Sequence, residues 1–216
     1  MRISFLGLVL NETLSWKSHV NKISMKILHV IGAMRRIKRI VNLGILLKIY
    51  NSLILSRIHF SILCWGTENK RIFKLQKKAT RIISKSSYNA HTDPLFKKHK
   101  LLKVKDIFSI QCLKFYYNYC HQKTPKYFNG MFHNIDTIHN HNTRRGYTIY
   151  TPSSKLRGTT RSIRYYLPKI ANDFPHNITI KIRTHSLPTI KQNSKNYLID
   201  KYEVNCLKVR CYICRR

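Results

Sequence analysis

Residues 15–41 read SWKSHVNKISMKILHVIGAMRRIKRIV. Apolar residues recur through this stretch at alternating steps of three and four positions. Because an α-helix completes one turn in about 3.6 residues, this spacing gathers them on one side of a helix. It predicts a helix from about residue 15 to residue 41 with a single packed face, which is formed by Val20, Ile23, Ile27, Val30, Met34, Ile37 and Val41.

The other faces of this helix carry cations almost exclusively. They lack the Glu and Lys pairs with which solvated helices balance their charges. A solvated surface helix is the simpler interpretation, but nearly pure cation favours a helix that faces phosphates. The basic residues are Lys17, Lys22, Lys26, His29, Arg35, Arg36, Lys38 and Arg39.

Further helices are predicted in the first half of the chain. Residues 45–62 are apolar on most faces, which is typical of the central helix of a bundle. Residues 70–85 predict a second basic amphipathic helix. A short helix should begin with Asp93 as its N-cap and Pro94 at its first position. Residues 104–121 predict a helix whose many aromatic rings belong to the core.

The two ends of the chain have a different character. Residues 3–10 read as one short strand. Beyond Pro125, the composition of residues 129–160 shifts to Asn, His, Thr and Arg, which indicates irregular structure. Helical patterns return at 162–174 and 186–202.

These segments together predict a mainly α fold. The expected organisation is a short N-terminal strand within residues 1–11, a helical bundle over residues 12–122, and a basic extension over residues 123–216. The extension should be partly irregular, with short helices.

The charge of the chain points to a polyanionic partner. It has 41 Lys and Arg against 8 Asp and Glu, a net charge of +33 over 216 residues. A compact chain of this kind repels itself unless its charge is neutralised, and nucleic acid is the usual partner because each neutralised phosphate releases a counterion. The cations are spread along the whole chain, which excludes a neutral domain with a basic tail.

A membrane surface is the alternative partner for basic amphipathic helices. The apolar stripe of residues 20–41 is narrow, however, and suits helix packing better than lipid. The longest apolar run, residues 43–63, contains Lys48, Arg57 and His59, which favours a buried helix over a membrane span. We therefore expect no membrane partner and an intracellular location, in the nucleus or the cytoplasm.

The eight acidic residues argue against catalysis by this chain. Metal-dependent phosphoryl transfer needs several carboxylates that converge on Mg²⁺, and no two acids are adjacent here. No glycine-rich phosphate loop and no motif of an activated Ser or Cys is present. The sequence thus predicts no catalytic residue and no cofactor.

Two clusters of metal-binding residue types are weak candidates. Cys206, Cys211 and Cys214 offer three thiolates, whereas a structural zinc site takes four ligands. A second cluster has no partner cysteines and reads as a polar loop; it contains His133, His139 and His141. We expect no metal site.

Short motifs follow one another in a fixed order along the chain. Phe5-Leu6-Gly7 precedes Leu14-x-Trp16-x-x-His19-Val20, and further motifs follow: Tyr50-Asn51-Ser52-Leu53-Ile54, Trp65-Gly66, Leu75-Gln76-Lys77-Lys78-Ala79-x-Arg81-Ile82-Ile83, His91-Thr92-Asp93-Pro94-Leu95-Phe96 and His141-Asn142-Thr143-Arg144. The series resembles the reverse transcriptases of non-LTR retrotransposons, the jockey-like LINE elements in particular. It begins where the palm of that family hands over to the thumb, and it covers most of the chain.

The resemblance implies a thumb, a helical bundle that grips the primer–template duplex, followed by a C-terminal extension. The palm, with its catalytic Asp pair and its Mg²⁺, would precede Met1, so residues 1–11 would be a remnant strand of the palm. Polymerase activity therefore does not carry over to this chain. A departure from the family is Ala171, which stands where a Trp is usual in a P-x-x-W-N-x-L-P stretch, as in a decaying element.

The expected function is an electrostatic grip on a nucleic-acid duplex, whose phosphate contacts fix position without reading sequence. The alternatives are a free-standing basic RNA-binding module and a translated remnant without function. The preference among RNA, DNA and hybrid, and the oligomeric state, stay open. The expected nucleic-acid-binding residues are Lys22, Lys26, Arg36, Arg39, Lys74, Lys77, Lys78, Arg81, Arg144 and Arg145.

Overall fold

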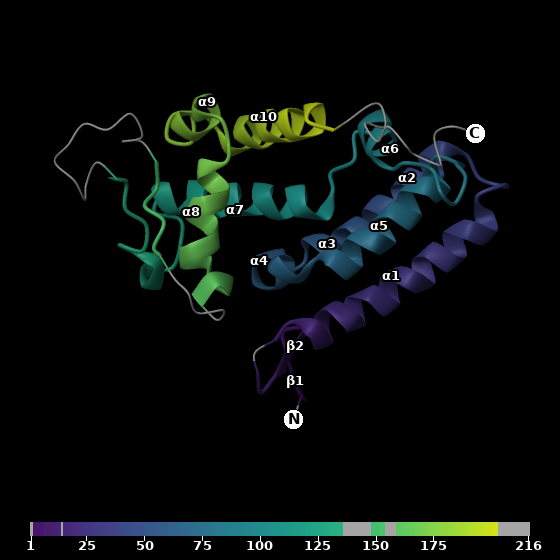
Figure 1. Ribbon diagram of the computed structural model, residues 1–216, viewed down its shortest axis with the longest axis horizontal. Coiled ribbons are helices and arrows are strands. Elements are labelled where there is room, and N and C mark those ends of the chain that lie inside the picture. Colours follow the sequence, from purple (N-terminus) through teal and green to yellow (C-terminus); the bar gives the residue numbers. More distant parts are fainter. Residues whose placement is uncertain (1, 14, 136–147, 154–158, 203–216) are drawn as a thin grey trace. The chain divides into compact units, whose positions relative to one another are not determined.

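The computed structural model describes residues 2–13, 15–135, 148–153 and 159–202. Contacts divide the chain into two compact units, one of residues 1–108 with 198–216 and the other of residues 109–197. Helices dominate the described residues (Figure 1), and the strands described form one antiparallel pair. The protein is therefore mainly α, as the sequence predicts.

The N-terminal segment is a β-hairpin, so the prediction of a single strand at 3–10 was wrong. Strand β1 (Arg2–Phe5) pairs antiparallel with β2 (Leu8–Asn11), and Phe5 lies opposite Leu8. Leu6 and Gly7 between them have φ angles of 46° and 82°, the left-handed conformations that a two-residue hairpin turn requires. Leucine is rare in that conformation, so the apolar run concealed the turn.

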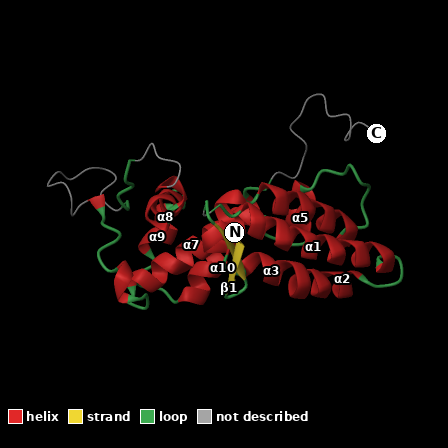
Figure 2. Cartoon of the chain, turned by 90° about the horizontal axis from the view of Figure 1, so that it is seen from below, coloured by secondary structure: helices red, strands yellow, loops and turns green. Residues whose placement is uncertain are grey.

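Helix α1 (Lys17–Ile37) follows the hairpin. The predicted stripe is confirmed from Val20 to Met34, whose apolar residues are buried. The helix ends at Ile37 rather than at residue 41, because Asn42 caps the next helix by accepting a hydrogen bond from the Ile45 N–H at 2.9 Å. Helix α5 (Lys70–Ile83) packs along α1, and Figure 2 shows the two side by side.

The predicted helix at 45–62 is not one regular helix. Helix α2 (Leu43–Ile49) continues into a π-helix η1 (Tyr50–Leu55) and α3 (Ser56–His59), and a left-handed Ser61 separates these from α4 (Ile62–Trp65) and a 3-10 turn η2 (Gly66–Glu68). The buried residues recur every four positions: Leu46, Tyr50, Ile54, Ile58 and Ile62.

This four-residue repeat explains the π-helix. On an α-helix, residues four apart drift by about 40° around the axis at each step. A wider π turn rotates in the opposite sense and returns the repeat to one face. The sequence pattern therefore contained the cause of the irregularity.

No single helix in the described ranges is long and apolar enough to cross a membrane. The segments Leu43–His59 and Ile62–Glu68 meet the length and composition together, but they are bent by 61°. Tyr50, Ile54 and Ile58 in the first segment are fully buried inside their unit.

Gln76 ties α5 to its neighbours. Its fully buried amide Nε2 donates to the Tyr50 hydroxyl at 2.7 Å and to the Leu102 carbonyl at 2.8 Å. Its Oε1 accepts from the Val104 N–H at 2.9 Å. Burial raises the pKa of Tyr50 to about 12, so this phenol stays neutral. One side chain thus fixes α5 against the central helix and the start of α7 (Val104–Cys120).

Helix α6 (Asp93–Lys98) has Thr92 at its N-cap, so the prediction of Asp93 as the cap and Pro94 as the first helical residue was one position late; Pro94 is the second residue of the helix. Asp93 instead forms an ion pair with Lys103 at 2.7 Å.

Tyr202 brings the end of the described chain back to the first unit. Its ring meets Phe96 edge-on with centroids 6.4 Å apart, and its hydroxyl donates to Asp106 and accepts from the Lys103 N–H at 3.0 Å. Residues 198–202 therefore group with the first unit, and local composition carries no sign of this return. The units divide within α7, between residues 108 and 109, whereas the composition placed the boundary at residue 122.

The second unit contains residues 109–120 of α7, a 3-10 turn η3 (Lys126–Phe128), a 3-10 turn η5 (Thr159–Arg161), α8 (Ile163–Asn172), α9 (His176–Ile180) and most of α10 (Leu187–Asp200). The predicted helices at 104–121, 162–174 and 186–202 are confirmed, and α9 was not predicted.

The Asn172 side chain forms two hydrogen bonds with the backbone of Ile149. Its Nδ2 donates to the Ile149 carbonyl at 2.8 Å and its Oδ1 accepts from the Ile149 N–H at 3.0 Å. Ala171, at the position of the resemblance's Trp, is fully buried.

Candidate nucleic-acid interface

The expected nucleic-acid-binding residues fall mainly on two helices that pack against each other. Arg144 and Arg145 lie outside the described residues. The other residues belong to α1 with the turn after it and to α5: Lys22, Lys26, Arg36 and Arg39, and Lys74, Lys77, Lys78 and Arg81.

These cations do not share one face. Lys22 and Lys26 line a cleft between α1 and α3, whereas Lys78 and Arg81 line a groove between α1 and α5. Lys77 lines a third hollow, beside the end of α10. The remaining cations are exposed and line none of the three: Arg36, Arg39 and Lys74.

The α1–α5 groove is a basic hollow of about 290 Å³. Four cations converge on it, two from each side, and no carboxylate is among the described residues that line it. Its lining is Arg35, Lys38, Lys78, Arg81, Ile82, Ser86 and Tyr88.

The end of α5 shapes this groove. Lys85 has a φ angle of 51°, and the Ser86 N–H donates back to the Arg81 carbonyl at 3.0 Å. This reversal carries Ser86 and Tyr88 to the rim of the groove, where the Tyr88 ring is 70% exposed. Arg81 is held in place because its Nε donates to the Ala90 carbonyl at 2.8 Å.

The positive charge of Arg81 in the groove persists although the residue is partly buried. Burial lowers the pKa of Arg81 and the neighbouring Tyr88 raises it, but a guanidinium remains protonated in proteins. Cations fixed close together without a carboxylate form a site of positive potential, which suits phosphate oxygens.

The α1–α3 cleft is a second basic hollow, of about 330 Å³. Its lining is Gly7, His19, Lys22, Ile23, Lys26, Ser56, Arg57 and Phe60. The Arg57 Nη1 donates to the Lys26 carbonyl at 3.3 Å, which anchors α3 to α1. His19 Nδ1 accepts from the Val9 N–H at 3.3 Å, and burial, then Lys22 and Lys26, lowers the His19 pKa.

The third hollow, of about 440 Å³, has mixed charge. Lys77 lies over the Phe73 ring at 4.5 Å from its centroid, and Lys103 lies over the Tyr202 ring at 4.2 Å. Asp93 and Asp106 line it as well. Burial raises the pKa of Asp106, while the Tyr202 hydrogen bond and the nearby lysines lower it. The charged groups of this hollow therefore interact mainly with other residues of the chain.

Among the residues of the two basic hollows that sequence reasoning did not choose are Arg35, Lys38, Arg57 and Tyr88. Arg35 and Lys38 were recognised as part of a basic face but not chosen, because their opposition to Lys78 and Arg81 depends on how α1 and α5 pack. Arg57 was hidden inside an apolar run. Tyr88 lies in a turn without periodicity, so no sequence signal marked it.

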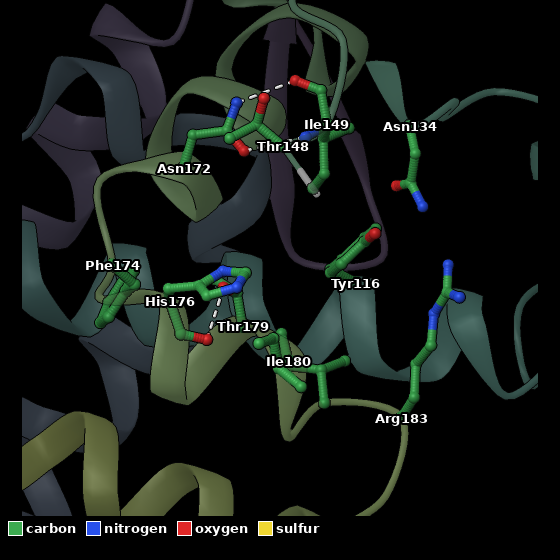
Figure 3. A pocket seen from close by; sticks show the side chains of 11 residues that line it. Tyr116, Asn134, Thr148, Ile149, Asn172, Phe174, His176, Thr179, Ile180 and Arg183 are labelled. Atoms are coloured by element: carbon green, nitrogen blue, oxygen red, sulfur yellow. Dashed lines mark hydrogen bonds between the residues drawn. The ribbon is translucent and has the colours of Figure 1, made fainter. Parts of the chain in front are cut away.

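The second unit contains a pocket of about 660 Å³ (Figure 3). The side chains of Tyr116, Asn134 and Arg183 converge on one side of it, and Asn172 and Ile149 form the opposite side. Burial raises the Tyr116 pKa well above its usual range. Asn134 and Thr148, which line the pocket, precede and follow residues 136–147 in the sequence, and those residues lie outside the described ranges.

The cysteines that the structure describes lie outside the linings of the two basic hollows. Burial raises the pKa of the Cys112 and Cys120 thiols, which favours their protonated form. No group of three or more His, Cys, Asp or Glu side chains within the described ranges could hold a metal ion. Most of the weak candidates lie outside those ranges: His139, His141, Cys206, Cys211 and Cys214.

Comparison with known proteins gives no relative. No family model, no curated protein and no solved structure matches the chain significantly.

Proposed function

We propose that this chain binds nucleic acid by its phosphate backbone, with the α1–α5 groove as the principal contact, in the manner of a polymerase thumb. The observation that carries the proposal is the groove itself, where four cations from two packed helices converge without a carboxylate. The net charge of +33 supports a polyanionic partner of the same kind.

The groove is suited to a backbone rather than to a small anion. Its four cations lie near the C-terminal ends of two packed helices and flank the groove from both sides, so a phosphate backbone that crosses the groove can meet cations from each helix. Gln76 fixes α5 from its buried side through three hydrogen bonds. Contacts of this type position a duplex and do not read its sequence.

The resemblance to non-LTR reverse transcriptases gives the proposal its context. A thumb holds the primer–template duplex, and the chemistry belongs to a palm with its Mg²⁺. We therefore propose binding without catalysis for this chain, with an RNA–DNA hybrid as the first ligand to test.

A free-standing RNA-binding module is the second candidate. The exposed Tyr88 ring favours it, because aromatic rings beside a basic groove stack on unpaired bases. Preference for single-stranded RNA over the hybrid duplex, lost in Tyr88→Ala, would select this function.

The test is a salt series of binding to a short RNA–DNA hybrid. The groove variant changes Arg35, Lys38 and Lys78 to Gln and leaves Arg81, which holds the Ala90 loop. The control variant removes the same charge at exposed sites on the same unit, by changing Lys48, Lys98 and Lys100 to Gln.

Each lost phosphate contact should make the slope of log K against log salt shallower by about 0.9. The groove variant should therefore lose about 2.7 in slope and at least about tenfold in affinity, and the control variant much less. Equal losses in both variants would mean that the bulk charge attracts nucleic acid and that the groove has no special part.

A further inference from the structure

His19 in the α1–α3 cleft has a hydrogen-bonding atom without a partner. Its side chain is 2% exposed, and its Nδ1 accepts the Val9 N–H, which places the proton of the neutral ring on Nε2. That Nε2 is buried and meets no acceptor among the described residues. Buried donors are almost always paired, so an unpaired one at a cavity indicates a missing acceptor.

The charges around the cleft indicate what that acceptor is. Lys22 and Lys26 come from α1 and Arg57 comes from α3, and the described lining contains no carboxylate. Three cations and an unsatisfied donor are complementary to the oxygens of an anion, and phosphate is the anion that such sets hold most often.

Apart from Ser56, the rest of the cleft lining is apolar. Phe60 is 48% exposed there, Ile23 lies in the lining, and Gly7 adjoins the Phe60 ring, since a Cβ at Gly7 would sit 3.4 Å from it. A space of about 330 Å³ exceeds what a lone phosphate fills and falls in the range of small-molecule sites.

We propose that the α1–α3 cleft is a separate site for a nucleoside phosphate, with its phosphate held by Lys22, Lys26, Arg57 and His19 and its base against Phe60. The ligand is a free nucleotide or the phosphorylated end of a strand. This site uses no residue of the α1–α5 groove, so it stands independently of the proposed function.

The chain carries its own reporter for this site. It has two tryptophans, and both flank His19: the ring centroids of Trp16 and Trp65 lie 6.3 Å and 6.4 Å from that of His19. Titration of the whole chain with adenosine monophosphate should therefore change the tryptophan fluorescence. Inorganic phosphate and adenosine serve as part-ligands.

The site variant is Lys22→Gln with Lys26→Gln, because both side chains are exposed and can be lost without unfolding. Its matched control is Lys48→Gln with Lys98→Gln, the same charge change at exposed positions of the same unit that line neither basic hollow. The site variant should lose at least about tenfold in affinity for adenosine monophosphate, and the control less than about twofold. Phe60→Ala should weaken adenosine monophosphate and leave inorganic phosphate unchanged.

The outcomes separate the sources and the alternatives. A 5′-phosphorylated oligonucleotide that competes with adenosine monophosphate, when the unphosphorylated one does not, supports a strand end, and no competition by either supports a free nucleotide. Equal binding of inorganic phosphate and adenosine monophosphate would overturn the nucleoside part. Absence of any fluorescence change, with the wild-type chain still binding the hybrid, would overturn the site and leave the groove proposal standing.

Discussion

The α1–α5 groove and the third hollow, which is the one beside Tyr202, lie at different faces of the same helix, α5. Both are rich in cations. In the groove, Lys78 and Arg81 meet Arg35 and Lys38, and the described lining has no acid. In the hollow, Lys103 is bound by Asp93 at 2.7 Å, and Asp106 is bonded to Tyr202.

The difference teaches that the few acids, rather than the many cations, decide which parts of this surface are neutralised within the chain. Two of the 8 acidic residues lie in the Tyr202 hollow, where they hold the chain together. Where no carboxylate is placed, the cations have no internal counter-charge and are available to an external polyanion.

The largest expected effect comes from Gln76, which fixes α5 and with it both the α1–α5 groove and the third hollow. Gln76→Leu should leave the Tyr50 hydroxyl, the Leu102 carbonyl and the Val104 N–H without their present partner, and should destabilise the protein by about 3 kcal/mol in chemical denaturation. Gln192→Leu, at an exposed position of α10, is the control and should change stability by less than about 0.5 kcal/mol. An equal, small effect in both variants would show that the two faces of α5 do not depend on this buried amide.

A smaller effect should follow from making the groove resemble the hollow. Ser86→Asp adds a carboxylate to the groove lining and should weaken hybrid binding by about tenfold at low salt, because it neutralises a cation and repels phosphate. Ser87→Asp has the same charge change one residue away, at an exposed position outside the lining, and should have a much weaker effect. Fluorescence anisotropy with a labelled hybrid measures both; identical losses would contradict a localised site.

The smallest effect should come from the hollow. Tyr202→Phe removes the donor to Asp106 and the acceptor of the Lys103 N–H, and should destabilise the protein by about 1 kcal/mol at neutral pH without changing nucleic-acid affinity. The exposed Tyr127→Phe is the control.

This loss should depend on pH. The Tyr202 hydroxyl stabilises ionised Asp106 and lowers its pKa, against burial, which raises it. Below that raised pKa the carboxyl is protonated in the folded protein, so the destabilisation by Tyr202→Phe should shrink as the pH falls and grow as it rises through the pKa. Denaturation curves of both proteins from about pH 4, near the ordinary pKa of a carboxyl group, up to about pH 7 check this prediction. A destabilisation that stays constant over this range would show that Tyr202 acts through something other than Asp106.

Much of the fold could be predicted because helices are local. The stripe from Val20 to Met34 and the basic face of α5 repeat with helical period, and the structure has helices at both. The hairpin turn at Leu6 and the break at Ser61 could not be predicted, since neither residue type is usual in a left-handed conformation.

The candidate site could be predicted only in part. Composition and periodicity pointed to the cations of α1 and α5, yet they placed Lys22, Lys77 and Lys78 in one set, and the structure distributes them over three hollows. No pattern in the sequence marked Arg57 or Tyr88 as a site residue, because their positions in the hollows depend on contacts with residues distant in the sequence.

The sequence by itself determined that this protein is helical, strongly basic and poor in acids, because period and charge are properties of neighbouring residues and of composition. Only the tertiary structure decided which cations face each other, where Asp93 and Asp106 neutralise them, and that Tyr202 returns to Phe96 and Asp106. Those arrangements depend on the directions in which whole helices pack, and the pattern of any single segment does not contain them.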